Sequence, residues 1–488
     1  MIWEVSRYFA LGFIRNQLIE PVNHLPFPGF GWLAPWPGDG MYYHFAILGV
    51  LALCILAGFA YRFATVTFFL GITYFFLLDQ CAFLNHLYLV CLVSFLMIFV
   101  PAGRRFSVDV FVRPGKRREM APAWGLQVLR FQIAIVYVFG AVTKIDRDWF
   151  GNIYIHELLL TRAEGSFLAP IAEAAWAVPV ITWGGFLFDL LVVPLLLWKR
   201  TRAVAFTGAV AFHCMNAWLF PIGIFPWLMI AATLLFFPPD WPRRARDRLS
   251  QRKQSALPKD RSGDDHVSHG NRGWRGRLIL GFLGVYATLQ VLVPLRHFLY
   301  PGYVGWTEEG HNFSWRMMLR TKAGEERFII FAVKDAATGW EGTTDLQSHV
   351  KPEHRGSAFS DRKLIEQIKR SIERDAARLG RAKIRMIEVQ TAVKFIVEGL
   401  ESAETIGVFD PRIVLSPWQA KAIIGRPPLI HLTARLIADS YKERGIPVAV
   451  RAESWVSLNG RVPRSQIDPS VDLAAREPSI WPADWILR

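Results

Sequence analysis

A single lysine stands where a long apolar stretch ends, in the segment VFGAVTKIDRDW. One interpretation of Lys144 is that its stem lies along apolar surface while its ammonium reaches water at a helix end. In the other interpretation the amine is buried. Burial disfavours the charged form, and a lysine that loses its proton near neutral pH can act as a base. Asp146 and Asp148 would oppose this by stabilising the cation if they face the amine.

Further polar residues interrupt the apolar stretches. Asn85 and His86 occur in LLDQCAFLNHLYL, and His213 and Asn216 occur in AFHCMNAWLFPIG. Such residues commonly form hydrogen bonds between packed helices, and a shared polar cluster is the functional alternative. Two histidines would also permit a bis-histidine haem, although nothing else in the spacing favours one. Asp189, in FLFDLLVVP, is a lone acid that needs a partner.

Composition indicates what positions these residues. The chain has 488 residues, of which 52% are hydrophobic, and this share points to a membrane protein. Long uncharged stretches end near residue 295, and charges are frequent afterwards. We therefore predict an α-helical polytopic membrane bundle with a C-terminal α+β extramembrane domain. The expected parts are an N-terminal extracytoplasmic segment (1–43), the transmembrane domain (44–295) and the extracytoplasmic domain (296–488).

The membrane domain is predicted to have about eight spans, since each candidate approaches the 17–25 mostly apolar residues that a span needs. The candidates are 44–61, 64–79, 84–100, 124–143, 179–198, 202–219, 222–237 and 278–295.

The charged loops predict the orientation of these spans. The net charge is +15, and the basic residues gather in alternate loops, including a predicted cytoplasmic linker at 241–277. Positive loops mark the cytoplasmic side, so this charge indicates topology and not a nucleic-acid partner. Segment 1–43, the C-terminal domain, His86 and Lys144 then share the non-cytoplasmic side. The four cysteines show neither metal-ligand nor disulfide spacing, and no metal is expected.

The C-terminal domain has alternating and helical patterns without a catalytic signature. GWTEEGHNFSWRMMLRTK is predicted to be a strand that enters a hairpin with ERFIIFAVKDAATGWEG. Its tryptophans and charges would equally suit an anchor at the membrane surface. Amphipathic helices are predicted over 360–380 and 381–400 and in PPLIHLTARLIADSYKERG, with a strand in IPVAVRAESWVSLN.

Five segments in order resemble the vitamin K-dependent γ-glutamyl carboxylase family and its bacterial relatives with a horizontally transferred transmembrane domain. They are FLLDQCAFLNHLYL, IVYVFGAVTKIDRDW, FHCMNAWLFPIGIF, GHNFSWRMMLR and WVSLNGRVPRSQIDPSVDL. The resemblance covers nearly the whole chain. Family members usually have one more span before WEVSRYF, so this chain is expected to start within that region. It is also expected to end without the β-rich tail of the animal enzymes.

The resemblance implies a carbon–carbon lyase. Vitamin K hydroquinone is oxidised by O2 to an epoxide, and the strong base formed on the way removes a γ-proton from a peptide glutamate, which then takes up CO2. By this resemblance Lys144 deprotonates the hydroquinone, and His86, beside Asn85, assists at the glutamate. His213 and Asn216 become membrane-site residues. The glutamate-site candidates are His311, Ser314, Trp315 and Arg320.

The implied partners are a lipophilic quinone from the bilayer and a glutamate-containing peptide from the aqueous side. The expected location is the inner membrane of a bacterium. Three other functions stay open: a quinol epoxidase or monooxygenase without carboxylase activity, a non-enzymatic membrane scaffold, and a haem-bearing electron carrier.

Overall fold

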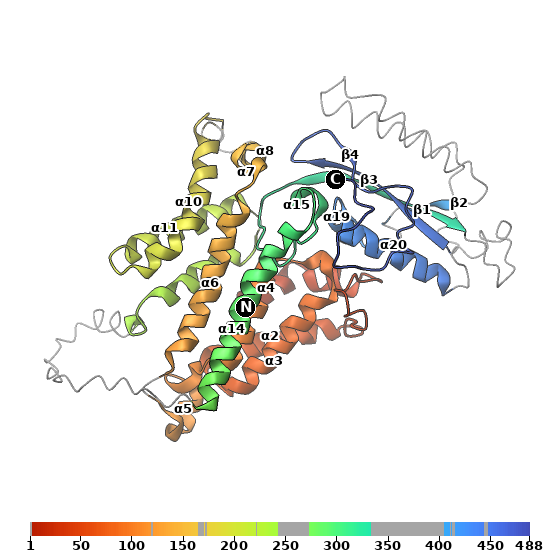
Figure 1. The fold of residues 1–488 in the computed structure, drawn as a ribbon. Helices are drawn as coiled ribbons and strands as arrows, with labels where there is room; N and C mark the ends of the chain where they lie inside the picture. The colour runs from red at the N-terminus through yellow and green to blue at the C-terminus, as the bar shows by residue number, and fades with distance from the viewer. Residues whose placement is uncertain are drawn as a thin grey trace, which may run out of the picture.

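The computed structural model describes residues 2–118, 121–163, 170, 173–220, 222–242, 273–332, 405–409, 411, 415–443 and 448–488. Within these ranges the chain forms a helical bundle and a smaller unit built on a sheet (Figure 1). Most of the predicted linker at 241–277 lies outside the described residues. The helices predicted over 360–380 and 381–400 also lie outside them.

Each of the eight apolar stretches forms a helix. They are α2 (Gly40–Ala57), α3 (Tyr61–Leu78), α4 (Asn85–Phe99), α6 (Ala123–Thr143), α10 (Ala177–Leu197), α11 (Arg202–Leu219), α12 (Phe225–Thr233, continued by a 3₁₀ turn at Leu234–Phe236) and α14 (Trp274–Leu295).

The described helices do not confirm eight spans. Five of them, α2, α3, α6, α10 and α14, are long and apolar enough to cross a membrane. A sixth span results if α4 and the helical residues Ala102–Val112, which bend away by 43°, are counted together. α11 contains Arg202, His213 and Asn216, which lower its hydropathy. Phe225–Phe236 is a shorter apolar helix, and at 1.5 Å per residue it falls well short of a hydrocarbon core of about 30 Å.

Shorter helices connect these elements. They are α1 (Ile2–Ala10), α5 (Val108–Val112), α7 (Arg147–Phe150), α8 (Ile153–Ala163), α15 (Val304–Thr307), α19 (Pro417–Ile423) and α20 (Pro427–Lys442). α2 packs on α3, α3 packs on α4, and α6 lies against α10 and α14. Apolar faces that point outward, such as Val50, Leu53 and Leu56 of α2, suit a lipid environment.

The C-terminal unit contains a four-stranded antiparallel sheet in the order β2-β1-β3-β4. The strands are β1 (Lys322–Ala332), β2 (Thr405–Phe409), β3 (Val448–Leu458) and β4 (Arg464–Ser465). Helix α20 packs on β3, and its residues Leu429 and Ile430 share a core with Phe328 and Val450. The predictions of α20 and β3 are confirmed.

The strand predicted for GWTEEGHNFSWRMMLRTK is wrong. This segment forms α15 and then irregular turns, and β1 begins only at Lys322. Glu308, Phe313, Trp315 and Met318 have positive φ angles there, which an extended strand does not allow. Alternation of residue types therefore reflects which side chains are buried in this loop and not a pleated strand.

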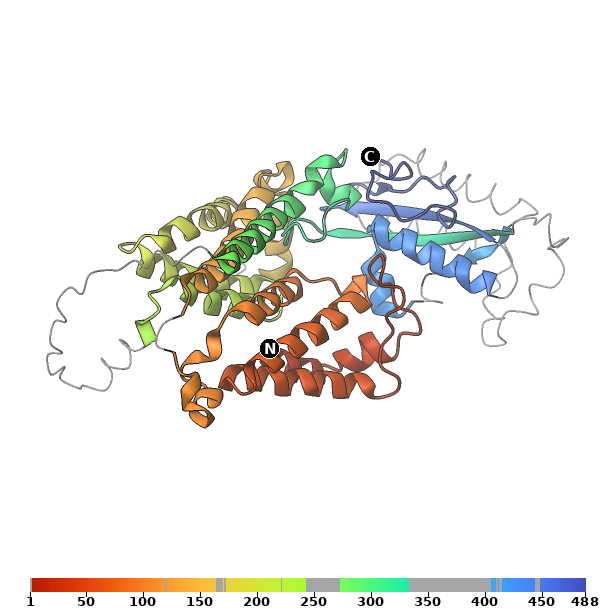
Figure 2. The ribbon, with the colours of Figure 1, turned by 60° about the horizontal axis from the view of Figure 1, so that its bottom comes forward.

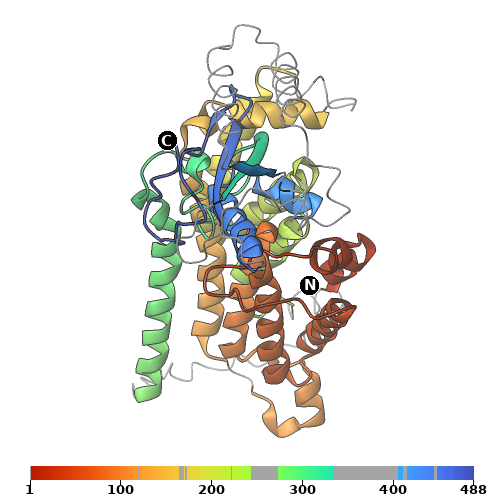
Figure 3. The same ribbon diagram turned by 90° about the vertical axis from the view of Figure 1, so that its right-hand side faces the viewer.

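The sheet unit lies at one end of the bundle, as Figures 2 and 3 show from two directions. Asp148, just after α6, forms an ion pair with Arg461 and accepts a hydrogen bond from Asn459 at 2.8 Å. Asp79, after α3, accepts a hydrogen bond from Gln419 of α19 at 2.7 Å. These buried contacts fix the sheet unit against the helices, so a cavity between them has defined walls.

Candidate active site

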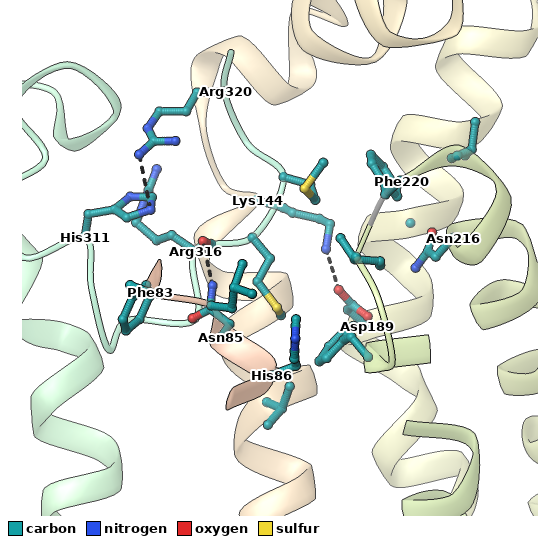
Figure 4. A pocket seen from close by; sticks show the side chains of 18 of the residues that line it. Phe83, Asn85, His86, Lys144, Asp189, Asn216, Phe220, His311, Arg316 and Arg320 are labelled. Carbon is teal, nitrogen blue, oxygen red and sulfur yellow. Dashed lines mark hydrogen bonds and ion pairs between the residues drawn. The ribbon is translucent and has the colours of Figure 1, made fainter. Parts of the chain in front are cut away.

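A cavity of about 310 Å³ lies between the membrane helices and the C-terminal unit. Its walls come from the start of α4, the C-terminal halves of α6 and α11, the middle of α10 and the loop after α15, parts of which are drawn in Figure 4. The start of α20 completes the lining. One part is apolar, lined by Tyr137, Phe212, Phe225 and Met229, among others. Another part is rich in charge. The lining there includes Glu308, His311, Arg316, Arg320 and Arg426.

Lys144 and Asp189 meet in this cavity. Lys144 caps the C-terminus of α6, and its Nζ forms an ion pair with Asp189 Oδ2 of α10. Nζ also donates to the Gly140 carbonyl at 3.3 Å and lies 5.2 Å from the ring centre of Trp149. Both side chains are largely buried, with exposures of 12% and 9%. The lone acid of the sequence therefore has Lys144 as its partner.

The two acids that follow Lys144 in the chain do not contact its amine. Asp146 accepts a hydrogen bond from Tyr303 at 3.0 Å and lies 3.5 Å from Arg316. Asp148 is paired with Arg461. Their carboxylates instead join the bundle to the C-terminal unit, which leaves Asp189 as the acid that balances Lys144.

The α6–α10 contact is adapted to this pair. At Gly140 a side-chain β-carbon would lie only 2.8 Å from Asp189 Oδ2, which is closer than real contacts allow. Glycine at this position therefore lets the carboxylate approach α6 and reach Lys144 one turn later.

Asn85 and His86 begin α4 and line the same cavity. Asn85 Nδ2 donates to the Arg316 carbonyl at 3.3 Å. Asn85 Oδ1 and His86 Nε2 are buried, and within the described part of the chain neither has a hydrogen-bond partner. Buried polar atoms are usually paired, so two unpaired atoms beside a cavity mark a place where a ligand can bind.

His213 and Asn216 lie on α11 at the apolar part of the cavity. His213 Nε2 and the Tyr137 hydroxyl form a hydrogen bond of 2.7 Å. The rings of Phe188, Phe212 and Phe225 surround the imidazole. This end therefore combines a flat apolar surface with a small number of polar groups, as sites for apolar ring compounds do.

The charged part centres on Glu308. It accepts from Arg320 Nε at 2.5 Å and pairs with Lys322 at 2.8 Å. Burial alone would raise the pKa of Glu308, but Arg320, Lys322 and their hydrogen bonding hold it well below its usual value. His311 lies beside them, and burial together with Arg320 lowers its pKa well below its usual value. The imidazole is therefore neutral among cations.

Two family models match this chain. The HTTM domain model matches residues 1–241, and the model for the lumenal domain of vitamin K-dependent gamma-carboxylase matches residues 275–393 and 383–488. The chain belongs to the vitamin K-dependent gamma-carboxylase family. No solved structure matches it. In this carboxylase-like membrane protein the cavity receives side chains from both matched regions.

Seven of the nine predicted site residues of this family member line the one cavity. They are Asn85, His86, Lys144, His213, Asn216, His311 and Arg320. Ser314 and Trp315 do not line it. Ser314 donates to the Gly310 carbonyl at 2.5 Å, and Trp315 is fully buried against Tyr88. Both side chains hold the loop after α15 in shape, because its positive φ angles leave the backbone without regular pairing.

Three charged residues in the cationic part of the cavity were not among the predicted site residues. Glu308 and Arg316 stand within the quoted loop but had no distinguishing pattern. Arg426 immediately precedes Pro427 and Pro428, at the N-cap of α20. A cation at a helix N-terminus opposes the helix dipole, and this signal could have singled out Arg426.

Proposed function

We propose that this protein couples epoxidation of vitamin K hydroquinone by O2 to carboxylation of a peptide glutamate by CO2. The observation that carries the proposal is the buried Lys144–Asp189 pair in a cavity that is apolar at one part and cationic at another. The family supports the same chemistry. The proposed location is a bacterial inner membrane with the C-terminal unit on the non-cytoplasmic side, as the alternating basic loops predict.

The apolar part fits a reduced quinone. The aromatic rings of Tyr137, Phe212 and Phe225 provide an apolar surface, and a lipid-soluble molecule can enter it from the bilayer. When bound, the quinol supplies, by reaction with O2, the strong base needed at the glutamate γ-carbon. Bulk water would quench such a base, so the reaction needs the bound quinol and peptide to displace water from the cavity.

Lys144 acts as the first base in this proposal. Its ammonium can pass a proton to Asp189 Oδ2, since the two groups are already joined by a hydrogen bond. The resulting neutral amine accepts the phenolic proton of the quinol. Asp189 thus positions the amine and stores its proton, in surroundings that exclude water.

His86 and Asn85 lie between the amine and the cationic end of the cavity (Figure 4). His86 Nε2 has no hydrogen-bond partner among the described residues, so it is available to a substrate. In the proposed reaction it faces the glutamate side chain, and the Asn85 amide, bonded to the Arg316 carbonyl, fixes the start of α4.

The test uses protein in nanodiscs with reduced vitamin K, O2, labelled bicarbonate and a glutamate-containing peptide. Epoxide and fixed label are followed together in the wild type, in Lys144→Ala and in Lys199→Ala, a control at an exposed loop lysine. We expect both products in the wild type and the control and neither in Lys144→Ala.

Other outcomes select other functions. Epoxide without fixed label identifies a quinol epoxidase. The proposed roles of His86 and of the other glutamate-site residues would then be wrong. Full epoxide formation by folded Lys144→Ala overturns the assigned base. Absence of both products in folded wild-type protein favours a membrane scaffold, and in that case reduced quinone leaves the melting temperature unchanged. A Soret absorption band in the purified protein would instead indicate the haem-bearing electron carrier.

A further inference from the structure

We infer that Arg426 and Arg316 form a carboxylate-binding site at the cationic end of the cavity, and that its ligand is the side chain of the peptide glutamate. The identity of this ligand rests on the proposed function. The site itself rests on the charge balance, on unpaired guanidinium nitrogens and on the position of Arg426 in the fold.

The charge balance leaves a positive excess. The cationic cluster consists of Arg316, Arg320, Lys322 and Arg426. The described acids that face it are Glu308, Asp146 and Glu326, and Glu326 is protonated at neutral pH because burial raises its pKa to about 8. Glu308 is shared by Arg320 and Lys322, and Asp146 lies 3.5 Å from Arg316. Four cations therefore share two carboxylates, while the neighbouring His311 is neutral.

Arg316 has capacity for a ligand. Its side chain is 5% exposed, and its Nε and Nη2 make no hydrogen bond within the described ranges, although Nη2 is the atom that lies in the ion pair with Asp146. At 3.5 Å the Asp146 carboxylate is farther away than the 2.7–2.9 Å that is usual for a charged hydrogen bond. A second carboxylate could take up the unused donors, since guanidinium groups bind carboxylates with two parallel hydrogen bonds.

The position of Arg426 is energetically unfavourable for a cation. Arg426 is the N-cap residue of α20, where the helix dipole disfavours a cation, and burial together with the nearby Arg320 lowers its pKa. The two prolines that follow remove N–H donors from the helix start. Among the described residues its guanidinium has no hydrogen-bond or ion-pair partner, although it lines the cavity. An anion in the cavity would offset these unfavourable terms.

The ligand that fits is a carboxylate on a short apolar stem. Pro428, Leu429 and Met317 line the cavity near the cations and can contact methylene groups. Carboxylation breaks one γ-carbon–hydrogen bond and forms one bond to the carbon of CO2. The proton passes to the base that quinol oxygenation supplies. The side chain then changes from one negative charge to two, which matches the two excess cations of the cluster.

The test measures binding without quinol or O2, so its result does not depend on catalysis. A fluorescent peptide with one glutamate and the same peptide with glutamine are titrated against protein in nanodiscs. We expect the wild type to bind the glutamate peptide at least about tenfold more tightly, as for a charge-assisted hydrogen bond. Arg426→Gln should abolish this preference and Arg426→Lys should retain part of it. Arg435→Gln, at an exposed ion pair of the same helix, should leave it unchanged.

Two results would overturn the inference. Equal binding of the two peptides by the wild type would show that the cations do not recognise the carboxylate. This comparison uses the wild type alone, so it does not depend on whether a variant folds. An Arg426→Gln protein with wild-type preference would exclude Arg426. Bicarbonate is added as a competitor in a third arm. If it displaces both peptides equally at low concentration, the site binds that anion and not the glutamate.

Discussion

Lys144 and Asp189 are 45 residues apart in the chain, yet their charged groups pair inside one cavity. The pair joins the C-terminal end of α6 to the middle of α10. Neither group has a second charged partner among the described residues. Each therefore depends on the other for charge compensation in a poorly hydrated place, and the pair is both a structural and a chemical unit.

Removal of one charge of the Lys144–Asp189 pair should lower the free energy of unfolding more than removal of both. Lys144→Ala and Asp189→Asn each leave the other group buried without a partner, and we expect each to lower the free energy of unfolding by about 3–5 kcal/mol. Lys144→Met combined with Asp189→Leu should lose less than either single variant, while remaining inactive. Denaturant titration in detergent measures these values. Additive losses in the double variant would show that the two groups do not interact.

The close approach of α6 and α10 at Gly140 should be needed for epoxide formation, although glycine itself carries no charge. Gly140→Ala introduces a methyl group 2.8 Å from Asp189 Oδ2 and should displace the carboxylate from Lys144. We expect epoxide formation to fall at least about tenfold, as for the loss of a charged hydrogen bond. Gly184→Ala is the matched control on α10, since its β-carbon would meet no atom within 4 Å. Equal activities of the two variants would contradict this role of Gly140.

The hydroxyl of Tyr137 should affect quinol binding through His213. Tyr137→Phe removes the 2.7 Å bond and leaves both imidazole nitrogens without partners, because Nδ1 already lacks one in the described structure. We expect a loss of about 1–3 kcal/mol of stability and a smaller rise in melting temperature on addition of reduced quinone. Tyr61→Phe serves as a control, because Tyr61 donates to backbone carbonyls away from the cavity. If reduced quinone raises the melting temperature of Tyr137→Phe as much as that of the wild type, the bond between Tyr137 and His213 does not contribute to quinone binding.

Glu326 should make stability depend on pH. It is buried on β1, accepts hydrogen bonds from Gly425 N at 2.8 Å and Ser454 Oγ at 3.0 Å, and burial raises its pKa to about 8. Between pH 4.5 and 8 the folded state therefore holds a proton that the unfolded chain has released. This contribution is fully present below pH 4.5 and is lost as the pH rises through 8, by at most about 1.4 kcal/mol per pH unit.

Glu326→Gln tests this dependence, because glutamine resembles the protonated acid and does not titrate. Melting temperatures are measured from pH 5 to pH 8.5 in both proteins. We expect the variant to equal the wild type near pH 5 and to exceed it near pH 8. Parallel curves would contradict the assignment. Glu453, whose pKa burial raises to about 7, keeps a smaller slope in both proteins.

The helices could be predicted from the sequence because a long apolar stretch in a membrane satisfies its backbone hydrogen bonds by forming a helix. The predicted count of eight spans is not confirmed, because α11 contains polar residues and α12 is short. The sequence also predicts a strand for the loop after α15. There the apolar side chains enter three different cores, with Phe313, Trp315 and Leu319 each in a separate one.

The candidate site could be predicted only in part. Lys144, His86 and His213 are conspicuous because a polar residue in an apolar stretch is costly. The partner of Lys144 could not be predicted, since the spacing of Asp189 carries no information about which helices pack together. Arg426 was not predicted because arginines are common in soluble units. Its position before two prolines at a helix start is the signal in the sequence that distinguishes it, and its place in the cavity is known only from the structure.

The cavity receives its amine from the region matched by the HTTM model and its arginines from the region matched by the lumenal model. In the proposed reaction, oxygen activation and acceptor choice would reside on separate stretches of chain that meet at one boundary. Exchange of the C-terminal region that carries both Arg316 and Arg426 would then retarget the modification to a different acceptor without changing the helices that hold the amine. Divergence of acceptors within such proteins would be concentrated in the C-terminal stretch, while the helices that hold the amine stay fixed.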